Sequence, residues 1–167
     1  MSNKLEYNVL RERWEIEYND DWFEENGKLF HTWFDPDLFE WRNCRYLAEY
    51  CSQYFEFWWD KDLYDYHESD ALTRHCYDNI KTWWNADKYN WRYSGLLAIF
   101  CADNFDLWYH IKYYCEDDRS IHIYESATKV THLVEHCIKD IDTWFDDASI
   151  YMHGESKLSI LSNVMYE

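Results

Sequence analysis

The chain contains an internal repeat, and this feature constrains its fold more than any other. When the sequence is laid over itself so that residues 31–59 lie over residues 81–109, ten of the 29 positions are identical. Both copies begin with Thr-Trp and an aromatic residue, at Thr32 and Thr82, and the same words return at Thr143. Self-similarity at a fixed interval is typical of proteins built from stacked copies of one structural unit.

The matching positions follow the spacing of one face of a helix. Steps of three and four residues alternate along two stripes, Trp41, Cys44, Ala48, Cys51, Phe55 and Trp58, then Trp91, Ser94, Ala98, Cys101, Phe105 and Trp108. This spacing predicts helices that bury one stripe each. Small residues in the middle of a stripe would let a neighbouring helix approach closely, so packing alone accounts for them.

Composition also favours an all-α fold. Glycine (3) and proline (1) are scarce, and no long run alternates apolar and polar residues, which argues against a sheet. The repeat and the breaks between its copies predict helices near 3–18, 20–34, 38–59, 70–84, 88–113 and 125–146. A second alignment lays His75-Cys76 over His136-Cys137. Its longer offset places the extra residues of the second unit near 110–124.

These helices predict one all-helical domain over residues 1–167, a length that can bury a sizeable core. Its repeats are expected at about 20–69, 70–124 and 125–167, and the last of them is incomplete. Helix pairs that cannot bury their apolar faces alone should stack on one another as a short α-solenoid. An irregular helical bundle is the alternative.

The charge of the chain narrows its partners. The formal net charge is −17, from 16 basic and 33 acidic residues. A nucleic-acid binder needs a basic footprint and an anionic membrane repels acidic proteins, so we expect neither partner. A basic protein would be attracted and steered toward this chain. The simpler interpretation is that the acidity keeps an aromatic-rich protein soluble.

The cysteines and the N-terminal sequence predict a cytoplasmic protein. The six cysteines are scattered without a C-x-x-C pair, and we interpret them as reduced core residues. The first 21 residues are charged throughout, unlike a signal peptide. The apolar stretch "SGLLAIFCA" (94–102) is too short to span a membrane.

Acidic residues next to the predicted helices indicate a partner-binding surface. The turns that close the first helices hold Asp35, Asp37, Asp87, Asp146 and Asp147, and those on the opposite edge hold Asp60, Asp62, Asp65, Glu116, Asp117 and Asp118. Four tyrosines accompany the second group, Tyr64, Tyr66, Tyr113 and Tyr114. Carboxylates interleaved with aromatic anchors are typical of protein-binding surfaces. The alternative is that loops are simply polar.

The segment "HLVEH", His132 to His136, is the sharpest local motif. It fits H-x-x-E-H and so resembles the zinc motif of inverted zinc peptidases. On a helix, His132 and His136 would lie one turn apart as metal ligands, with Glu135 beside them to activate a water. The repeat partner of the motif holds Ala71 and Arg74 in place of the first histidine and the glutamate, which favours packing or capping. We therefore predict that the protein holds no metal. If it did hold one, His132 and His136 would be the candidate ligands.

No other motif indicates catalysis. Nucleophile elbows and glycine-rich phosphate loops are absent from the sequence. We therefore expect no enzymatic activity, no cofactor and no small-molecule substrate.

One segment resembles a known class of proteins. Residues 83–105, "WWNADKYNWRYSGLLAIFCADNF", are similar to helical immunity proteins of bacterial contact-dependent and polymorphic toxin systems, which pair with DNase toxins. Those proteins carry a Tyr-Pro-Tyr-Asp segment further on, where this chain has "YYCEDD" (113–118). The resemblance implies an immunity protein that binds and neutralises one cognate toxin, without catalysis.

Two other functions are open at this point. A phage anti-defence protein that mimics DNA would also be acidic, but it would bind many DNA-binding enzymes with a steep dependence on salt. A zinc-dependent hydrolase would use His132, Glu135 and His136 and would hold stoichiometric zinc. We predict the immunity function, with these two as alternatives.

Overall fold

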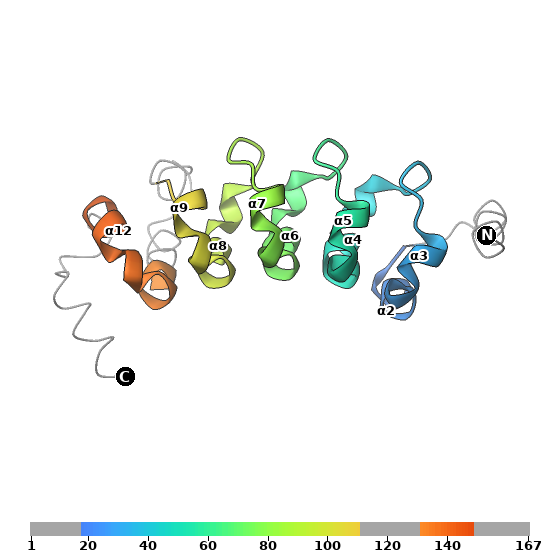
Figure 1. Cartoon of the computed structure of the whole chain (residues 1–167), viewed down its shortest axis with the longest axis horizontal. Helices are drawn as coiled ribbons and strands as arrows, with labels where there is room; N and C mark the ends of the chain where they lie inside the picture. The colour runs from blue at the N-terminus through green and yellow to red at the C-terminus, as the bar shows by residue number, and fades with distance from the viewer. Residues whose placement is uncertain (1–17, 111–130, 149–167) are drawn as a thin grey trace. The chain divides into compact units, whose positions relative to one another are not determined.

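In a computed structural model, the described part of the chain covers residues 18–110 and 131–148, and its side chains are described as far as residue 145. Every element in these ranges is an α-helix or a short 3-10 helix, and the ranges contain no strand (Figure 1). The all-α class is therefore confirmed. The predicted helix at 3–18 and the insertion at 110–124 lie outside these ranges, apart from residues 18 and 110.

The chain divides into two compact units, residues 1–79 and residues 80–167, which we describe separately. The first unit contains α2 (Asp20–Asn26), η1 (Gly27–Leu29), α3 (Phe30–Trp33), η2 (Trp41–Asn43), α4 (Cys44–Cys51), η3 (Ser52–Tyr54), α5 (Phe55–Trp58), η4 (Tyr66–Glu68), α6 (Ser69–His75) and η5 (Tyr77–Asn79). The second contains α7 (Ile80–Trp83), η6 (Trp91–Tyr93), α8 (Ser94–Phe100), η7 (Ala102–Asn104), α9 (Phe105–Trp108), a helix at 131–136, η8 (Ile138–Asp140) and α12 (Ile141–Ala148). The single domain, its repeat boundaries and the solenoid or bundle stay predictions.

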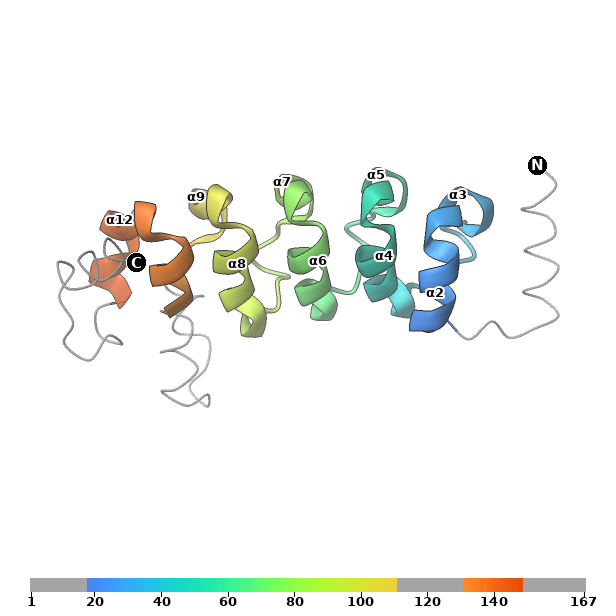
Figure 2. The ribbon, with the colours of Figure 1, turned by 90° about the horizontal axis from the view of Figure 1, so that it is seen from below.

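In the first unit, α2, α4 and α6 lie side by side, with α4 in contact with both neighbours (Figure 2). Asn19 caps the first of these helices, because its side chain accepts a hydrogen bond of 2.9 Å from the backbone N–H of Trp22. The packing is close on both sides of α4. A Cβ at Gly27 would lie 2.9 Å from the Tyr50 carbonyl oxygen, and the Cys76 Sγ lies 3.9 Å from the Ala48 carbonyl oxygen.

The long helices predicted at 38–59 and 88–113 are wrong, because each begins later and is broken in the middle. Helical structure begins only at residues 41 and 91, and Cys51 and Cys101 then leave the helix with φ near −125° and −122°. At each break, the cysteine carbonyl oxygen accepts the indole N–H of a tryptophan seven residues later, Trp58 at 2.9 Å and Trp108 at 2.8 Å. The Cys101 carbonyl also accepts the backbone N–H of Asn104 at 2.9 Å, so the indole there is a second donor beside the 3-10 hydrogen bond.

The same local structure recurs at half the interval that the sequence comparison indicates. The short helices α3, α5, α7 and α9 begin at regular intervals along the sequence, at Phe30, Phe55, Ile80 and Phe105. Indole bonds over seven residues are also made by Trp33 to the Asn26 carbonyl at 2.8 Å and by Trp144 to the Cys137 carbonyl at 2.9 Å. The repeat seen in the sequence therefore covers two copies of one local element, and "FEFWW" (55–59) is a degenerate copy of the Thr-Trp words.

The predicted helix stripes form core. All members of both stripes are buried except Trp41, which is partly exposed and donates its indole N–H to the Pro36 carbonyl at 3.1 Å. The cysteines are also core residues, as predicted. Five of them lie in the described part of the chain, where all are buried and none forms a disulfide: Cys44, Cys51, Cys76, Cys101 and Cys137. Burial raises the pKa of the Cys51 and Cys76 thiols to about 12, so both stay protonated and unreactive at neutral pH.

Candidate protein-binding site

Two turns of the first unit share one geometry and carry half of the predicted acidic residues that lie in the described ranges. In the turn at 35–39, the Asp35 carboxylate accepts the backbone N–H of Asp37 at 3.1 Å, and the Asp35 carbonyl accepts that of Phe39 at 2.9 Å. In the turn at 60–64, the Asp60 carboxylate accepts the Asp62 N–H at 2.8 Å. The first aspartate of each turn therefore fixes the backbone, in an Asx turn.

The second unit repeats this turn at 85–89 with an amide in the first position. The Asn85 side-chain oxygen accepts the backbone N–H groups of Asp87 at 3.0 Å and Lys88 at 3.2 Å. The Trp91 indole closes the turn by donating to the Ala86 carbonyl at 2.9 Å. Here one carboxylate, that of Asp87, is exposed beside a lysine, so this turn is less acidic than the two in the first unit.

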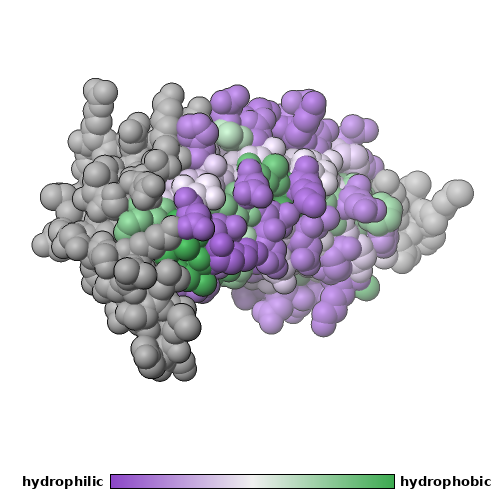
Figure 3. Space-filling model, turned by 60° about the vertical axis from the view of Figure 1, so that its left-hand side comes forward, coloured by the Kyte–Doolittle hydropathy of each residue, from purple (hydrophilic) through white to green (hydrophobic). Residues whose placement is uncertain are grey.

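The tips of the two turns in the first unit expose both charge and apolar surface. Asp37 and Asp62 are exposed, and each is followed by an exposed leucine, Leu38 at 41% and Leu63 at 45%. In the space-filling view of Figure 3, hydrophilic residues cover most of the described surface, with smaller apolar patches among them. The leucines were missed by sequence reasoning, although the recurrence of "DPDL" (35–38) as "DKDL" (60–63) could have revealed them.

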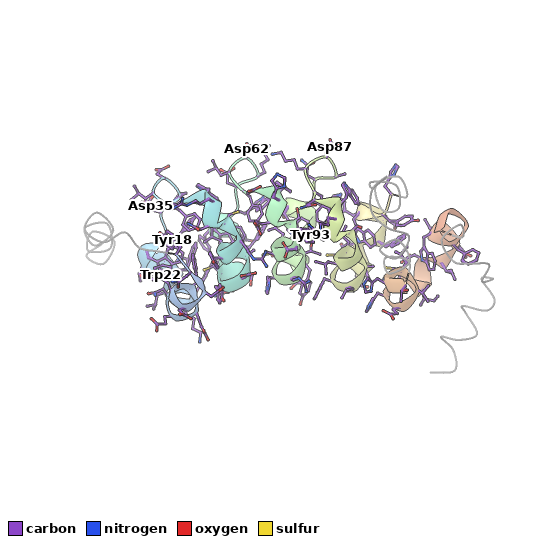
Figure 4. All side chains as sticks on the ribbon, turned by 180° about the vertical axis from the view of Figure 1, so that it is seen from behind. Tyr18, Trp22, Asp35, Asp62, Asp87 and Tyr93 are labelled. Atoms are coloured by element: carbon purple, nitrogen blue, oxygen red, sulfur yellow. The ribbon has the colours of Figure 1, made fainter. Side chains whose placement is uncertain are left out.

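The prediction of two opposite acidic edges is wrong within the first unit. It places Asp35 and Asp37 on one edge, and Asp60, Asp62 and Asp65 on the other. Both turns follow the second, short helix of a helix pair, and they project on the same side of the unit (Figure 4). The reason is that the local structure recurs at half the interval of the sequence repeat. The two turns are therefore equivalent parts of neighbouring copies and lie on the same edge.

Tyr64 and Tyr66 are not surface anchors, which corrects another prediction. They are 4% and 8% exposed, and the Tyr64 hydroxyl donates to the Glu68 carbonyl at 3.1 Å. Burial raises the pKa of Tyr64 well above its usual value and that of Tyr66 to about 12. Tyr64 packs under the turn because the position after Asp-x-Asp-x faces inward, as Phe39 does in the preceding copy.

Three of the remaining predicted residues are described, and none of them lies in a turn of this kind. Asp65 is exposed and its side chain accepts the His67 backbone N–H at 3.0 Å, so it caps η4. Asp146 and Asp147 lie within α12 and not beyond its end, because that helix continues to Ala148. Five others lie outside the described residues, Tyr113, Tyr114, Glu116, Asp117 and Asp118.

The histidine motif folds as a helical cluster. His132, Glu135 and His136 lie on the helix at 131–136, and their ligand atoms are all within 4.8 Å of one another. The Glu135 Oε2 lies 3.7 Å from both His132 Nδ1 and His136 Nε2. The histidines proposed from the sequence as ligands are thus brought together in the second unit.

No protein-family model, curated protein or solved structure matches the chain. Within the described ranges, no helix has both the length and the apolar character needed to cross a membrane.

Proposed function

We propose that this chain is a helical binding module whose acidic turns engage a basic protein. More specifically, we propose that it is an immunity protein that neutralises a cognate toxin domain, a basic nuclease, without catalysis. The observation that carries the proposal is the pair of equivalent turns at 35–39 and 60–64, each of which exposes a carboxylate next to a leucine.

The geometry of the turns supports binding because it is fixed in advance. Backbone hydrogen bonds hold both turns through Asp35 and Asp60, so little conformational freedom is left to lose when a partner docks. Exposed leucines offer apolar contact at the centre of a charged patch, as core residues of an interface do. The net charge of −17 adds long-range attraction for a basic partner.

The nuclease is the finer part of the proposal. Nucleases carry basic surfaces that hold phosphates, and carboxylates on rigid turns could occupy such a surface in place of phosphates. The resemblance to immunity proteins paired with DNase toxins that we expect for residues 83–105 is a further reason for this choice. Phosphate mimicry alone would not need the leucines, so we favour recognition of one partner.

Co-expression with the product of the adjacent upstream gene tests the proposal. We expect the full chain to rescue cells from that product and to bind it in a pull-down. The double variant Asp37→Asn/Asp62→Asn should weaken affinity at least about 10-fold, since hydrogen bonds to charged groups contribute about 1.5–3 kcal/mol each. The matched control Glu25→Gln/Glu56→Gln removes two exposed carboxylates from α2 and α5 and should leave affinity within about twofold.

The leucines provide a second, independent measurement. Leu38→Ala/Leu63→Ala should weaken binding while the slope of affinity against salt concentration stays unchanged, because no charge is removed. Failure to rescue cells from the neighbouring gene product, or equal losses in the turn and control variants, would contradict the proposal. Binding to several unrelated DNA-binding proteins would favour the DNA mimic instead.

A further inference from the structure

We infer that His132, Glu135 and His136 form a binding site for a divalent transition-metal ion of the zinc class. The three side chains come from a little more than one turn of a single helix in the second unit. Two imidazole nitrogens and one carboxylate oxygen are the donor set that zinc and its neighbours accept, whereas calcium and magnesium prefer oxygen alone.

The distances between Glu135 and the two imidazoles indicate that this carboxylate is the third metal ligand. Metal bonds of about 2.0–2.1 Å in a tetrahedral site place ligand atoms about 3.3 Å apart. Glu135 Oε2 lies 3.7 Å from His132 Nδ1 and 3.7 Å from His136 Nε2, which is too long for a hydrogen bond to either imidazole. Small side-chain rotations would close all three atoms onto one ion.

The orientation of His132 is set by its surroundings. The Cδ2 edge of the ring faces Gly95 of α8, where a Cβ would lie only 3.1 Å from that carbon. The opposite edge therefore presents Nδ1 toward Glu135. This Nδ1 is buried and has no hydrogen-bond partner among the described residues. A buried nitrogen without a partner costs free energy, and a metal ion would supply the missing interaction.

The fold does not require this cluster. Aligned on the cysteines at 51, 76, 101 and 137, the equivalent residues are Tyr46, Glu49 and Tyr50 in α4, Ala71, Arg74 and His75 in α6, and Leu96, Ile99 and Phe100 in α8. Glu49 stands at the place of Glu135 and His75 at the place of His136, so single members of the cluster recur. Among these four copies, only the helix at 131–136 combines two histidines with a glutamate, and the other three helices form without that combination.

The same geometry argues against a hydrolase. In a zinc peptidase the glutamate of the motif acts as a general base and activates a metal-bound water. Here the Glu135 oxygen lies equally close to both nitrogens, so the carboxylate would coordinate the ion. The site is partly open, since His136 is 38% and Glu135 56% exposed at the side chain, and a water completes the coordination. We assign it a binding role, independent of the acidic turns.

Isothermal titration calorimetry of the full-length chain with zinc chloride, under reducing conditions, tests the inference. We expect one equivalent of zinc per chain with a micromolar dissociation constant. His136→Gln and Glu135→Gln should each weaken binding at least about 10-fold, because even outer-shell partners of a metal contribute that much. Both positions are exposed, so circular dichroism should show an unchanged helical signal.

The matched control is His75→Gln. His75 is exposed, precedes a buried cysteine and occupies in α6 the place of His136, but it has no second histidine one turn away. Zinc affinity should stay within about twofold in this variant. Excess zinc should also raise the Tm of the native chain but not that of His136→Gln, because only a folded site binds the ion.

Cobalt replaces zinc as a spectroscopic probe and decides which atoms coordinate. Absorption without a sulfur-to-cobalt charge-transfer band supports the histidine site, whereas such a band means cysteine ligands and overturns it. Two further results overturn the inference: the native chain binds no stoichiometric zinc, or it binds zinc equally in the His136→Gln and His75→Gln variants.

Discussion

The helix pair α4–α6 of the first unit and the pair of α8 with the helix at 131–136 in the second unit share one buried contact but differ around it. The Cys76 Sγ lies 3.9 Å from the Ala48 carbonyl, and the Cys137 Sγ lies 3.9 Å from the Ala98 carbonyl. Beside this contact, the first pair carries a partly buried Arg45 that binds three carboxylates.

The second pair carries weaker polar contacts. Lys139 and Asp103 form one exposed ion pair of 2.9 Å, and His132 packs edge-on against Gly95. The contact that recurs is the one that the fold needs, a small residue under a thiol. The polar contacts are free to vary between copies, and this freedom allows one copy to gather the ligand-type side chains of the histidine cluster.

The largest expected effect is unfolding at alkaline pH, and it should be similar in both pairs. Burial raises the pKa of the Cys76 and Cys137 thiols from 9.0 to about 12. Since the folded state holds these protons more tightly, the stabilisation is fully present below about pH 9 and is lost as pH rises toward 12. Each thiol should lower the free energy of unfolding by about 1.4 kcal/mol per pH unit in that window.

Urea titrations of the full chain between pH 8 and pH 11, followed by tryptophan fluorescence, measure this slope. Cys76→Ala and Cys137→Ala should each reduce it by about 1.4 kcal/mol per pH unit, whatever they do to stability at pH 8. An unchanged slope in either variant would show that burial does not raise the pKa of that thiol in the folded state.

The next effect is the loss of stability when larger side chains are placed at the thiol contact that the two helix pairs share. Ala48→Leu and Ala98→Leu each place a branched side chain where a thiol lies against the helix backbone, and both alanines are 0% exposed. We expect each variant to lower the free energy of unfolding by about 1–3 kcal/mol, by similar amounts, because the geometry is shared. A loss in one pair alone would mean that the two contacts are not equivalent. Denaturant titration at neutral pH measures it.

The buried pattern could be predicted from the sequence better than the turns could. The stripe containing Cys51 and Ala48 indicates a helix face directly, because burial depends on side-chain periodicity. The break at Cys51 could not be predicted, since it depends on an indole that returns to a carbonyl seven residues away. Helix periodicity continues through the break, so one long helix was the natural interpretation.

Because these helix breaks were not predicted, the acidic turns were assigned to the wrong edges. Without them, the sequence predicts a repeat unit twice as long as the local one, and equivalent turns fall on opposite edges. The burial of Tyr64 follows from its place in the turn and not from its residue type, so composition suggested a surface anchor. The histidine cluster was visible from spacing alone, whereas the close approach of Gly95 needed the structure.

The two glycines sharpen the comparison between the units. A Cβ at Gly27 meets the backbone oxygen of Tyr50 at 2.9 Å, whereas one at Gly95 meets the side chain of His132 at 3.1 Å. A backbone oxygen cannot yield without moving α4, but a side chain can shift by a few tenths of an ångström. Gly27→Ala should therefore destabilise the chain by about 1–3 kcal/mol, and Gly95→Ala by less than about 1 kcal/mol. Thermal unfolding of both variants compares them, and equal losses would contradict the difference in rigidity.

The two kinds of ion pair should also differ in their contribution to stability. Arg45 contacts Glu49 at 2.8 Å, Glu68 at 2.9 Å and Asp70 at 3.3 Å, and Asp70 is only 8% exposed. Arg45→Ala would leave these carboxylates close together without a cation. We expect a loss of about 1–2 kcal/mol, below that of a fully buried pair because solvent screens the half-exposed guanidinium.

Lys139→Ala, in the second unit, breaks an ion pair whose carboxylate on Asp103 is 96% exposed, so it should leave the denaturation midpoint unchanged. Added salt provides the deciding measurement, because it screens exposed charges first. The difference between native chain and Arg45→Ala should persist at high salt, since Asp70 stays buried beside its acidic neighbours. If salt abolishes that difference, the Arg45 cluster is a surface network like the Lys139 pair, and the polar contacts of the two units do not differ in strength.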